Sequence, residues 1–174
     1  MELDFEIDKI TKSIESVETG ERFETQVVPI TKADLKEITK KNGWLFDWKI
    51  EFSQPERQVY KLIAEKEPSV IQGLVAFEKW DKDKLVYMPL VESAPFNVGK
   101  KKLYEGVCGN LVAYGCKLSK EYGFGGYLYF EAKTALIEHY KKKLRATHIC
   151  GQKIAIEFAA ADRLIGSYFH EQKE

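Results

Sequence analysis

The stretch that decides the fold is "YEGVCGNLVAYGCKLSKEYGFGGYLYFEA", residues 104–132. Apolar residues recur in it at helical spacing and predict a helix over 107–122. Glycines stand at both ends of that helix, and the aromatic run at 127–132 predicts a strand after it. Residues 84–92 predict another strand upstream, so the local order is strand, glycine-containing loop, helix and strand.

The loop before the helix contains Gly106 and Gly109. A helix N-terminus presents unpaired N–H groups and partial positive charge, and glycine lets ligand oxygens approach the backbone. The lysines at 100–102 would add charge to such an anion site. Neither a Walker loop nor a dinucleotide fingerprint is present. Two glycines alone favour a plain helix start, with a phosphate loop as the alternative.

The remaining segments predict an α/β (α+β) fold, with a mixed sheet and helices on both faces. Antiparallel hairpins come first and a βαβ unit follows. Pro89 lies inside a strand pattern and predicts a bulge or an edge. The further strands are expected at 24–31, 57–65, 69–80, 147–150 and 153–158, and the further helices at 31–43, 136–144 and 161–168.

The first residues carry an apolar stripe that steps by four and three, which predicts an amphipathic helix. We expect residues 1–22 to form this N-terminal helix and a turn, and 23–174 to form the main domain. The helix is expected to dock on the domain itself, with a partner or dimer surface as the alternative. The stripe consists of Leu3, Ile7, Ile10, Ile14 and Val17, and Gly20 is the expected C-cap.

Composition excludes several classes of protein. The 174 residues suit one domain, and 27 basic against 27 acidic residues give no general attraction to nucleic acid or anionic membrane. Three cysteines without a CxxC pair, and three scattered histidines, argue against a zinc site and for reduced thiols. No signal peptide and no apolar run of about 20 residues is visible, so we expect a cytoplasmic protein.

Three segments, "LVYMPLVESAPFN", the stretch quoted first and "LIEHYKKKLRA", occur in this order and at close spacing. Together they resemble the Gcn5-related N-acetyltransferase (GNAT) superfamily, in particular a bacterial subgroup of acetyltransferase-like proteins. The resemblance spans about residues 57–158. The family motif Q/R-x-x-G-x-G/A falls on residues 103–108, and the motif AxxFYxxxGF resembles "ALIEHYKKKLRA".

The resemblance implies that acetyl-CoA is the co-substrate and that no metal takes part. In the family the fourth and fifth strands splay apart, the pantetheine arm lies in the gap, and the loop amides hold the pyrophosphate. Those two strands correspond here to 84–92 and 127–132. The residues expected to bind acetyl-CoA are Val91, Lys102, Leu103, Tyr104, Glu105, Gly106, Val107, Cys108, Gly109 and Asn110.

The expected catalytic residues are Tyr140 and Glu92. The resemblance implies that Tyr140 protonates the leaving thiolate; the alternative is a core tyrosine, since Tyr140 lies on an apolar stripe. Glu92 ends its strand beside the expected thioester and could accept the proton of the amine; the alternative is a structural glutamate. Phe96 and Asn97 are expected to contact the acceptor, but turn chemistry explains Asn97 equally well.

Three functions remain open. The first is an acetyl-CoA-dependent N-acetyltransferase that acts on an amine of a small molecule or protein by direct attack, in a chain that could form a homodimer. The second is a non-catalytic member with a degenerate loop, favoured by Leu103, Glu105 and Cys108, which depart from the family motif. The third is a toxin-like enzyme that acetylates charged tRNA, to which the neutral composition gives no support.

Overall fold

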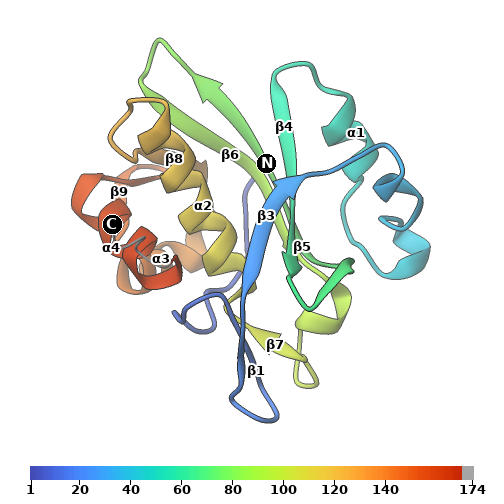
Figure 1. The fold of residues 1–174 in the computed structure, drawn as a ribbon. Coiled ribbons are helices and arrows are strands. Elements are labelled where there is room, and N and C mark those ends of the chain that lie inside the picture. Colours follow the sequence, from blue (N-terminus) through green and yellow to red (C-terminus); the bar gives the residue numbers. More distant parts are fainter. Residues whose placement is uncertain (170–174) are drawn as a thin grey trace.

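The computed structural model describes residues 1–169. Its main sheet has seven strands in the order β3-β4-β5-β6-β8-β10-β9 (Figure 1). Every neighbouring pair is antiparallel except β6 and β8, so the predicted mixed, mostly antiparallel sheet is confirmed. The strands are β3 (Thr25–Pro29), β4 (Arg57–Ala64), β5 (Glu67–Trp80), β6 (Leu85–Ser93), β8 (Leu128–Glu131), β9 (Thr147–Cys150) and β10 (Lys153–Ile156).

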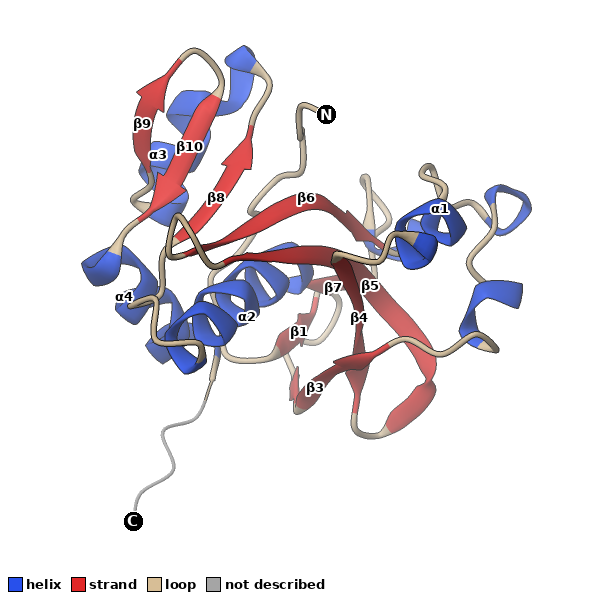
Figure 2. Cartoon of the chain, turned by 90° about the horizontal axis from the view of Figure 1, so that it is seen from above, coloured by secondary structure: helices blue, strands red, loops and turns tan. Residues whose placement is uncertain are grey.

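Strands β6 and β8 separate soon after they meet. Their parallel pairing comprises Val86 with Leu128 and Tyr87 with Tyr129, whereas β6 runs on to Ser93. Figure 2 shows the two strands diverging beyond this junction, with the start of the chain in the gap. The predicted splay is therefore confirmed.

The predicted irregularity at Pro89 is a bulge in β6. Ala76 of β5 pairs with Leu90, and Glu78 pairs with Tyr87. Strand β6 thus advances three residues where β5 advances two, and Pro89 lies in that interval. Proline suits this position because a bulged residue needs no ladder hydrogen bond.

Helices cover both faces of the sheet, as predicted. Glu92 of β6 accepts a hydrogen bond from the indole of Trp48 in α1 (Trp48–Ser53), whereas the next residue, Ser93, contacts Cys108 in α2 (Val107–Glu121). Successive side chains of a strand point to opposite faces, so α1 and α2 lie on opposite sides. The other helices are α3 (Ile137–Leu144) and α4 (Phe158–Tyr168), and α4 packs against α2.

The N-terminal helix predicted within residues 1–22 is wrong, because residues 3–7 are extended and a hairpin follows them. Leu3, Phe5 and Ile7 are buried and the acidic residues between them are exposed, which is the period of two of a strand. The Leu3 amide donates to the Glu131 carbonyl at 2.8 Å, beside the end of β8. Gly20, the expected C-cap, lies instead in the turn between β1 (Ile14–Ser16) and β2 (Arg22–Phe23), with a φ of 73°.

The predicted helix over 31–43 is also wrong, because two short 3-10 turns replace it, η1 (Asp34–Lys36) and η2 (Lys40–Asn42). The Thr31 amide donates to the Asp34 carboxylate at 2.8 Å, and the Thr39 hydroxyl accepts from the Asn42 amide at 3.2 Å. Each turn thus has its own side-chain hydrogen bonds, and these local bonds compete with a continuous helix. Gly43 ends η2 with a φ of 97°, a left-handed conformation that glycine adopts at low cost.

A second, three-stranded sheet has the order β2-β1-β7 and fastens the start of the chain to the loop before α2. In β7 (Tyr104–Glu105), Tyr104 pairs with Ser16 and Glu105 with Glu15. The loop backbone is therefore fixed by the chain's own N-terminal strands.

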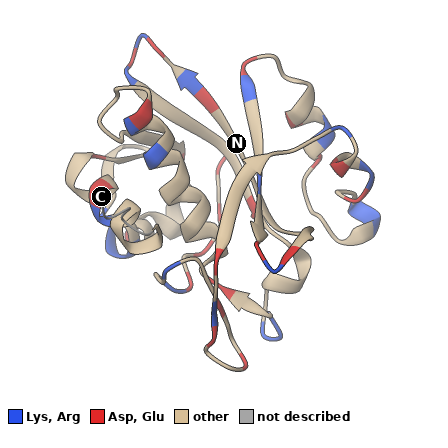
Figure 3. Ribbon diagram, in the orientation of Figure 1, with Lys and Arg blue, Asp and Glu red and all other residues tan. Residues whose placement is uncertain are grey.

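Acidic and basic residues are interspersed along the chain (Figure 3), in keeping with its formal net charge of zero. Among residues 1–169, no helix combines the length and the apolar character needed to cross a bilayer.

Candidate functional site

A cavity of about 660 Å³ lies between the N-terminal segment and the end of β6. We use "N-terminal segment" for residues 3–13, which begin in the gap between β6 and β8 (Figure 2) and continue past the start of α2 to Tyr168. The opposite wall comes from the loop before α1 and from the loop after β6. The lining residues used below are Asp4, Phe5, Glu6, Asp8, Leu45, Glu92, Ser93, Asn97, Lys102 and Cys108.

Glu92 lies at this cavity, and both of its carboxylate oxygens accept hydrogen bonds. One oxygen accepts from the Leu45 amide at 2.7 Å and the other from the Trp48 indole at 2.8 Å. Trp48 is fully buried, so Glu92 holds the loop before α1 against the sheet. Each carboxylate oxygen has a further acceptor site, so the same group could also receive a proton or a hydrogen bond from the cavity.

Asn97 shapes the loop that follows β6. Its amide group donates to the Gln72 backbone carbonyl at 3.1 Å and to the Gln72 side chain at 2.9 Å. Its side-chain oxygen accepts from the Tyr104 amide at 3.1 Å. Phe96 beside it is partly exposed, and its carbonyl accepts from the Leu103 amide. The hydrogen bonds of Asn97 are thus made within the protein, while the residue still lines the cavity.

The start of α2 already holds an anion, which is the carboxylate of Asp8. Gly106 is the N-cap with a φ of 93°, and its amide donates to Asp8 Oδ1 at 3.0 Å. Lys102 Nζ lies 3.1 Å from Asp8 Oδ2. A helix N-terminus with a lysine beside it is a donor set suited to phosphate, so these residues fit a pyrophosphate, but Asp8 now uses them.

Most of the other residues predicted to bind acetyl-CoA face the protein. A Cβ at Gly109 would lie 1.8 Å from the Tyr168 hydroxyl, so this glycine makes room for α4. Asn110 is fully buried and donates to the Ser13 carbonyl at 3.1 Å. Of the predicted set, Lys102 and Cys108 line the cavity. Tyr104 and Glu105 lie in β7. Val91 and Val107 are buried, and the side chain of Leu103 is exposed.

Tyr140 lies beneath the N-terminal segment and does not line the cavity. Its side chain is fully buried, and its hydroxyl donates to the Phe5 carbonyl at 2.6 Å. Its ring packs between Phe5 and Phe130, with ring centroids 4.7 and 5.2 Å away. Burial raises the pKa of Tyr140, and the neighbouring Cys108 adds to that shift. The hydroxyl therefore stays protonated and occupied by the chain itself.

Burial also shifts the pKa values of two further residues, Cys108 and His139. Cys108 lies 3.1 Å from the Ser93 hydroxyl, and burial raises the pKa of its thiol to about 12, so it is a neutral thiol and not a nucleophile. His139 accepts the Ile7 amide at 3.0 Å through Nε2, and burial lowers its pKa. It is a packing histidine.

Sequence reasoning missed the contribution of the N-terminal segment to the site. Asp4, Phe5, Glu6 and Asp8 all line the cavity. The alternation of apolar and acidic residues in "LDFEID" was the available signal, because it has the period of a strand. Within residues 1–169, no group of three or more His, Cys, Asp or Glu side chains is placed to hold a metal ion.

Solved structures share this fold. The structure of AtaTR bound with acetyl-CoA has a TM-score of 0.55 and 13% identity, covering 80% of this chain and 97% of that one. The ribosomal-protein-S18-alanine N-acetyltransferase from Escherichia coli has a TM-score of 0.52 and 12% identity, covering 76% and 90%. The KacTA–DNA complex has a TM-score of 0.54 and 11% identity, covering 82% and 99%.

These likenesses concern the fold: the chain has the fold of the Gcn5-related N-acetyltransferase superfamily, as the sequence resemblance implied. No family model matches the sequence, and no curated protein matches it either.

Proposed function

We propose that the chain is an acetyl-CoA-dependent acyltransferase that acetylates an amine. The observation that carries this proposal is the splay of β6 and β8, which has the capped start of α2 and a cavity of about 660 Å³ beside it. Acetyl-CoA would supply the activated acyl group. Its pyrophosphate fits two donors, the Gly106 amide and the Lys102 ammonium group. The other loop residues of the predicted set would position these donors rather than contact the ligand.

The charge of the cavity favours an amine as acceptor. Carboxylates of Asp4, Glu6, Asp8 and Glu92 line it together with Lys102. Away from Lys102, these carboxylates favour a cationic acceptor over an anionic one. Leu45 is 75% exposed and lines the same cavity, so an acceptor with an apolar part beside its amine would bury surface there.

Glu92 is the proposed base and Tyr140 the proposed acid of the reaction. Glu92 lies at the cavity and is fixed by two donors, so it could take the proton of the attacking amine directly or through water. The Tyr140 hydroxyl donates to Phe5, so it can protonate a leaving thiolate only after the N-terminal segment has moved. Phe96 and Asn97 are the proposed acceptor contacts at the rim.

The test is the variant Glu92→Gln, which keeps the shape of the side chain and removes its basicity. General-base catalysis contributes about 10²- to 10⁴-fold, so we expect a loss of that order in acetyl transfer to a panel of amines. Trp48→Phe is the matched control, because it removes one donor to Glu92 and keeps the carboxylate. Comparable losses in both variants would assign Glu92 a structural role only.

A non-catalytic binding module is the second candidate. It is favoured by the occupation of Gly106 and Lys102 by Asp8, and by the sealed hydroxyl of Tyr140. Thermal unfolding by calorimetry, with and without acetyl-CoA, discriminates the two candidates. A bound ligand at about 100 times its Kd stabilises the folded state by about 2.7 kcal/mol. The absence of any binding at millimolar acetyl-CoA would favour the module.

A further inference from the structure

The N-terminal segment occupies a place that a ligand of this fold would need. It passes between the diverging strands β6 and β8, and Figure 2 shows it in that gap. Its side chains also form one wall of the cavity, from Asp4 to Asp8. The segment thus narrows the space beside β6 and reaches the start of α2.

Asp8 makes the contacts that an anionic ligand would make. Its carboxylate accepts the Gly106 amide at 3.0 Å and lies 3.1 Å from Lys102 Nζ. The side chains of Asp8 and Lys102 are 21% and 24% exposed, so this ion pair is partly shielded from solvent. A phosphate oxygen at the helix start would need the same N–H and the same ammonium group, because a single amide hydrogen serves one strong acceptor at a time.

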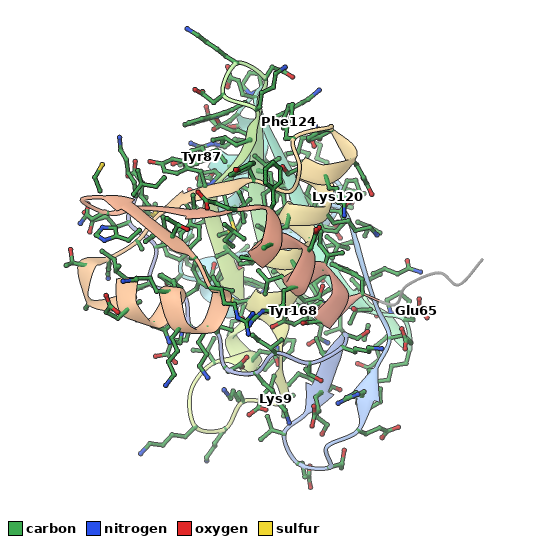
Figure 4. The ribbon with its side chains drawn as sticks, turned by 90° about the vertical axis from the view of Figure 1, so that its left-hand side faces the viewer. Lys9, Glu65, Tyr87, Lys120, Phe124 and Tyr168 are labelled. Carbon is green, nitrogen blue, oxygen red and sulfur yellow. The ribbon has the colours of Figure 1, made fainter. Side chains whose placement is uncertain are left out.

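The segment is held at separate points rather than by a continuous strand ladder. Within the described residues, its β-bridge to the main sheet is the single pair of Leu3 with Ala132. Further along, its backbone depends on side chains of two C-terminal helices, namely Tyr140 and His139 of α3 and Tyr168 of α4. In Figure 4, Tyr168 and Lys9 are labelled, and the Tyr168 hydroxyl donates to the Lys9 carbonyl at 3.0 Å. Such point contacts can be exchanged locally, at a lower free energy than global unfolding.

We propose that the N-terminal segment is a built-in competitor for the ligand site, with the Asp8 carboxylate standing where a phosphate of the acyl-CoA binds. The ligand binds when Asp8 leaves Gly106 and Lys102, and the same movement uncovers the Tyr140 hydroxyl by withdrawing the Phe5 carbonyl. This inference rests on the proposed function, since it takes acetyl-CoA as the ligand.

The closing experiment compares Asp8→Asn with Asp4→Asn in the full chain. Both variants remove one negative charge from the same segment and the same cavity wall. Asp4, however, pairs with the exposed Lys133 at 2.9 Å, so its variant controls for the general charge of the cavity. Asp8→Asn loses a charge-assisted pair and frees Lys102, so we expect it to bind acetyl-CoA about tenfold more tightly than the unmodified chain, and Asp4→Asn less than about twofold.

Hydrogen exchange on the unmodified chain gives an independent readout. The amides of Leu3, Ile7 and Ser13 donate to Glu131, His139 and Tyr168. With acetyl-CoA bound, these amides should exchange faster, although a ligand ordinarily slows exchange near its site. Slower or unchanged exchange in residues 3–13 would overturn the inference, and so would equal affinities of Asp8→Asn and the unmodified chain.

Inorganic pyrophosphate separates failure of this inference from failure of the proposed function. If acetyl-CoA binds every variant equally, the competition is refuted and the proposed function stands. If acetyl-CoA binds none of them but pyrophosphate binds Asp8→Asn about tenfold more tightly than the unmodified chain, the competition stands and the proposed function fails. If neither probe binds any variant, both are refuted.

Discussion

Substituting Gly109 by alanine separates a structural glycine from a ligand-binding one. A Cβ at this position would lie 1.8 Å from the Tyr168 hydroxyl oxygen and 2.5 Å from Cζ, so Tyr168 must move. That movement would break the hydrogen bond from Tyr168 to the Lys9 carbonyl and disturb the packing of α4 on α2. The reading of Gly109 as a site of phosphate approach predicts weaker acetyl-CoA binding and no loss of stability.

The magnitude follows from two costs. Overpacking a filled interior costs about 1–3 kcal/mol, and the lost hydrogen bond costs about 1 kcal/mol more. The matched control is Gly166→Ala in α4, where an added Cβ meets no atom within 4 Å. Each substitution removes a glycine from a helix, which alone stabilises by up to about 1 kcal/mol. We therefore expect Gly109→Ala to be about 2–4 kcal/mol less stable than Gly166→Ala.

Urea denaturation measures this difference, provided that both variants unfold in one cooperative transition with the same slope. A Tyr168→Phe substitution in the Gly109→Ala background removes the nearest clashing atom, so the combined loss should be smaller than the sum of the single losses. Equal unfolding free energies of Gly109→Ala and Gly166→Ala would refute the reasoning.

Two further predictions concern the contacts beneath the N-terminal segment. Tyr140→Phe leaves the Phe5 carbonyl without its buried donor and should lower the unfolding free energy by about 1–3 kcal/mol in urea; no loss would show that this hydrogen bond contributes nothing. Protonation of His139 removes the acceptor of the Ile7 amide, and burial lowers its pKa although Glu6 raises it and Lys143 lowers it further. Because the folded pKa lies below the unfolded value near 6.5, the unfolded chain binds more protons between the two values, so stability is complete above about 6.5 and falls as the pH drops through that window. His139→Gln should flatten this part of the stability profile, and an unchanged profile in the variant would contradict the assignment.

The parts of the fold that sequence predicted are those with local signals. Helix α2 has apolar residues at helical spacing between glycines, and the bulge at Pro89 follows from a proline that cannot donate to the ladder. The helix predicted for the N-terminal segment was wrong because the spacing of Leu3 and Ile7 fits both the period of a helix and the period of a strand. Phe5 distinguishes the two periods. It is buried, like Leu3 and Ile7 on either side of it, whereas in a helix it would not lie on their apolar stripe.

The candidate site was predictable in outline and not in its contacts. Glu92 could be placed at the end of its strand from the sequence, but its two donors, Leu45 and Trp48, depend on a loop path that no local pattern specifies. The glycine loop was recognised, yet its occupant could not be, because Asp8 and Gly106 are 98 residues apart. A contact between residues so far apart in sequence forms only when the whole fold is assembled.

The distances along the chain between the N-terminal segment and its partners have a consequence for synthesis. Ile7 and Lys9 find their partners 132 and 159 residues later. On the ribosome, therefore, Leu3 and Phe5 must remain without these native neighbours until β8 has emerged, and Ile7 until α3 has emerged. An alternating apolar segment left exposed in this way is prone to pair with other extended chains. The acidic residues between its apolar positions supply like charges that oppose such pairing while the rest of the protein is still being made.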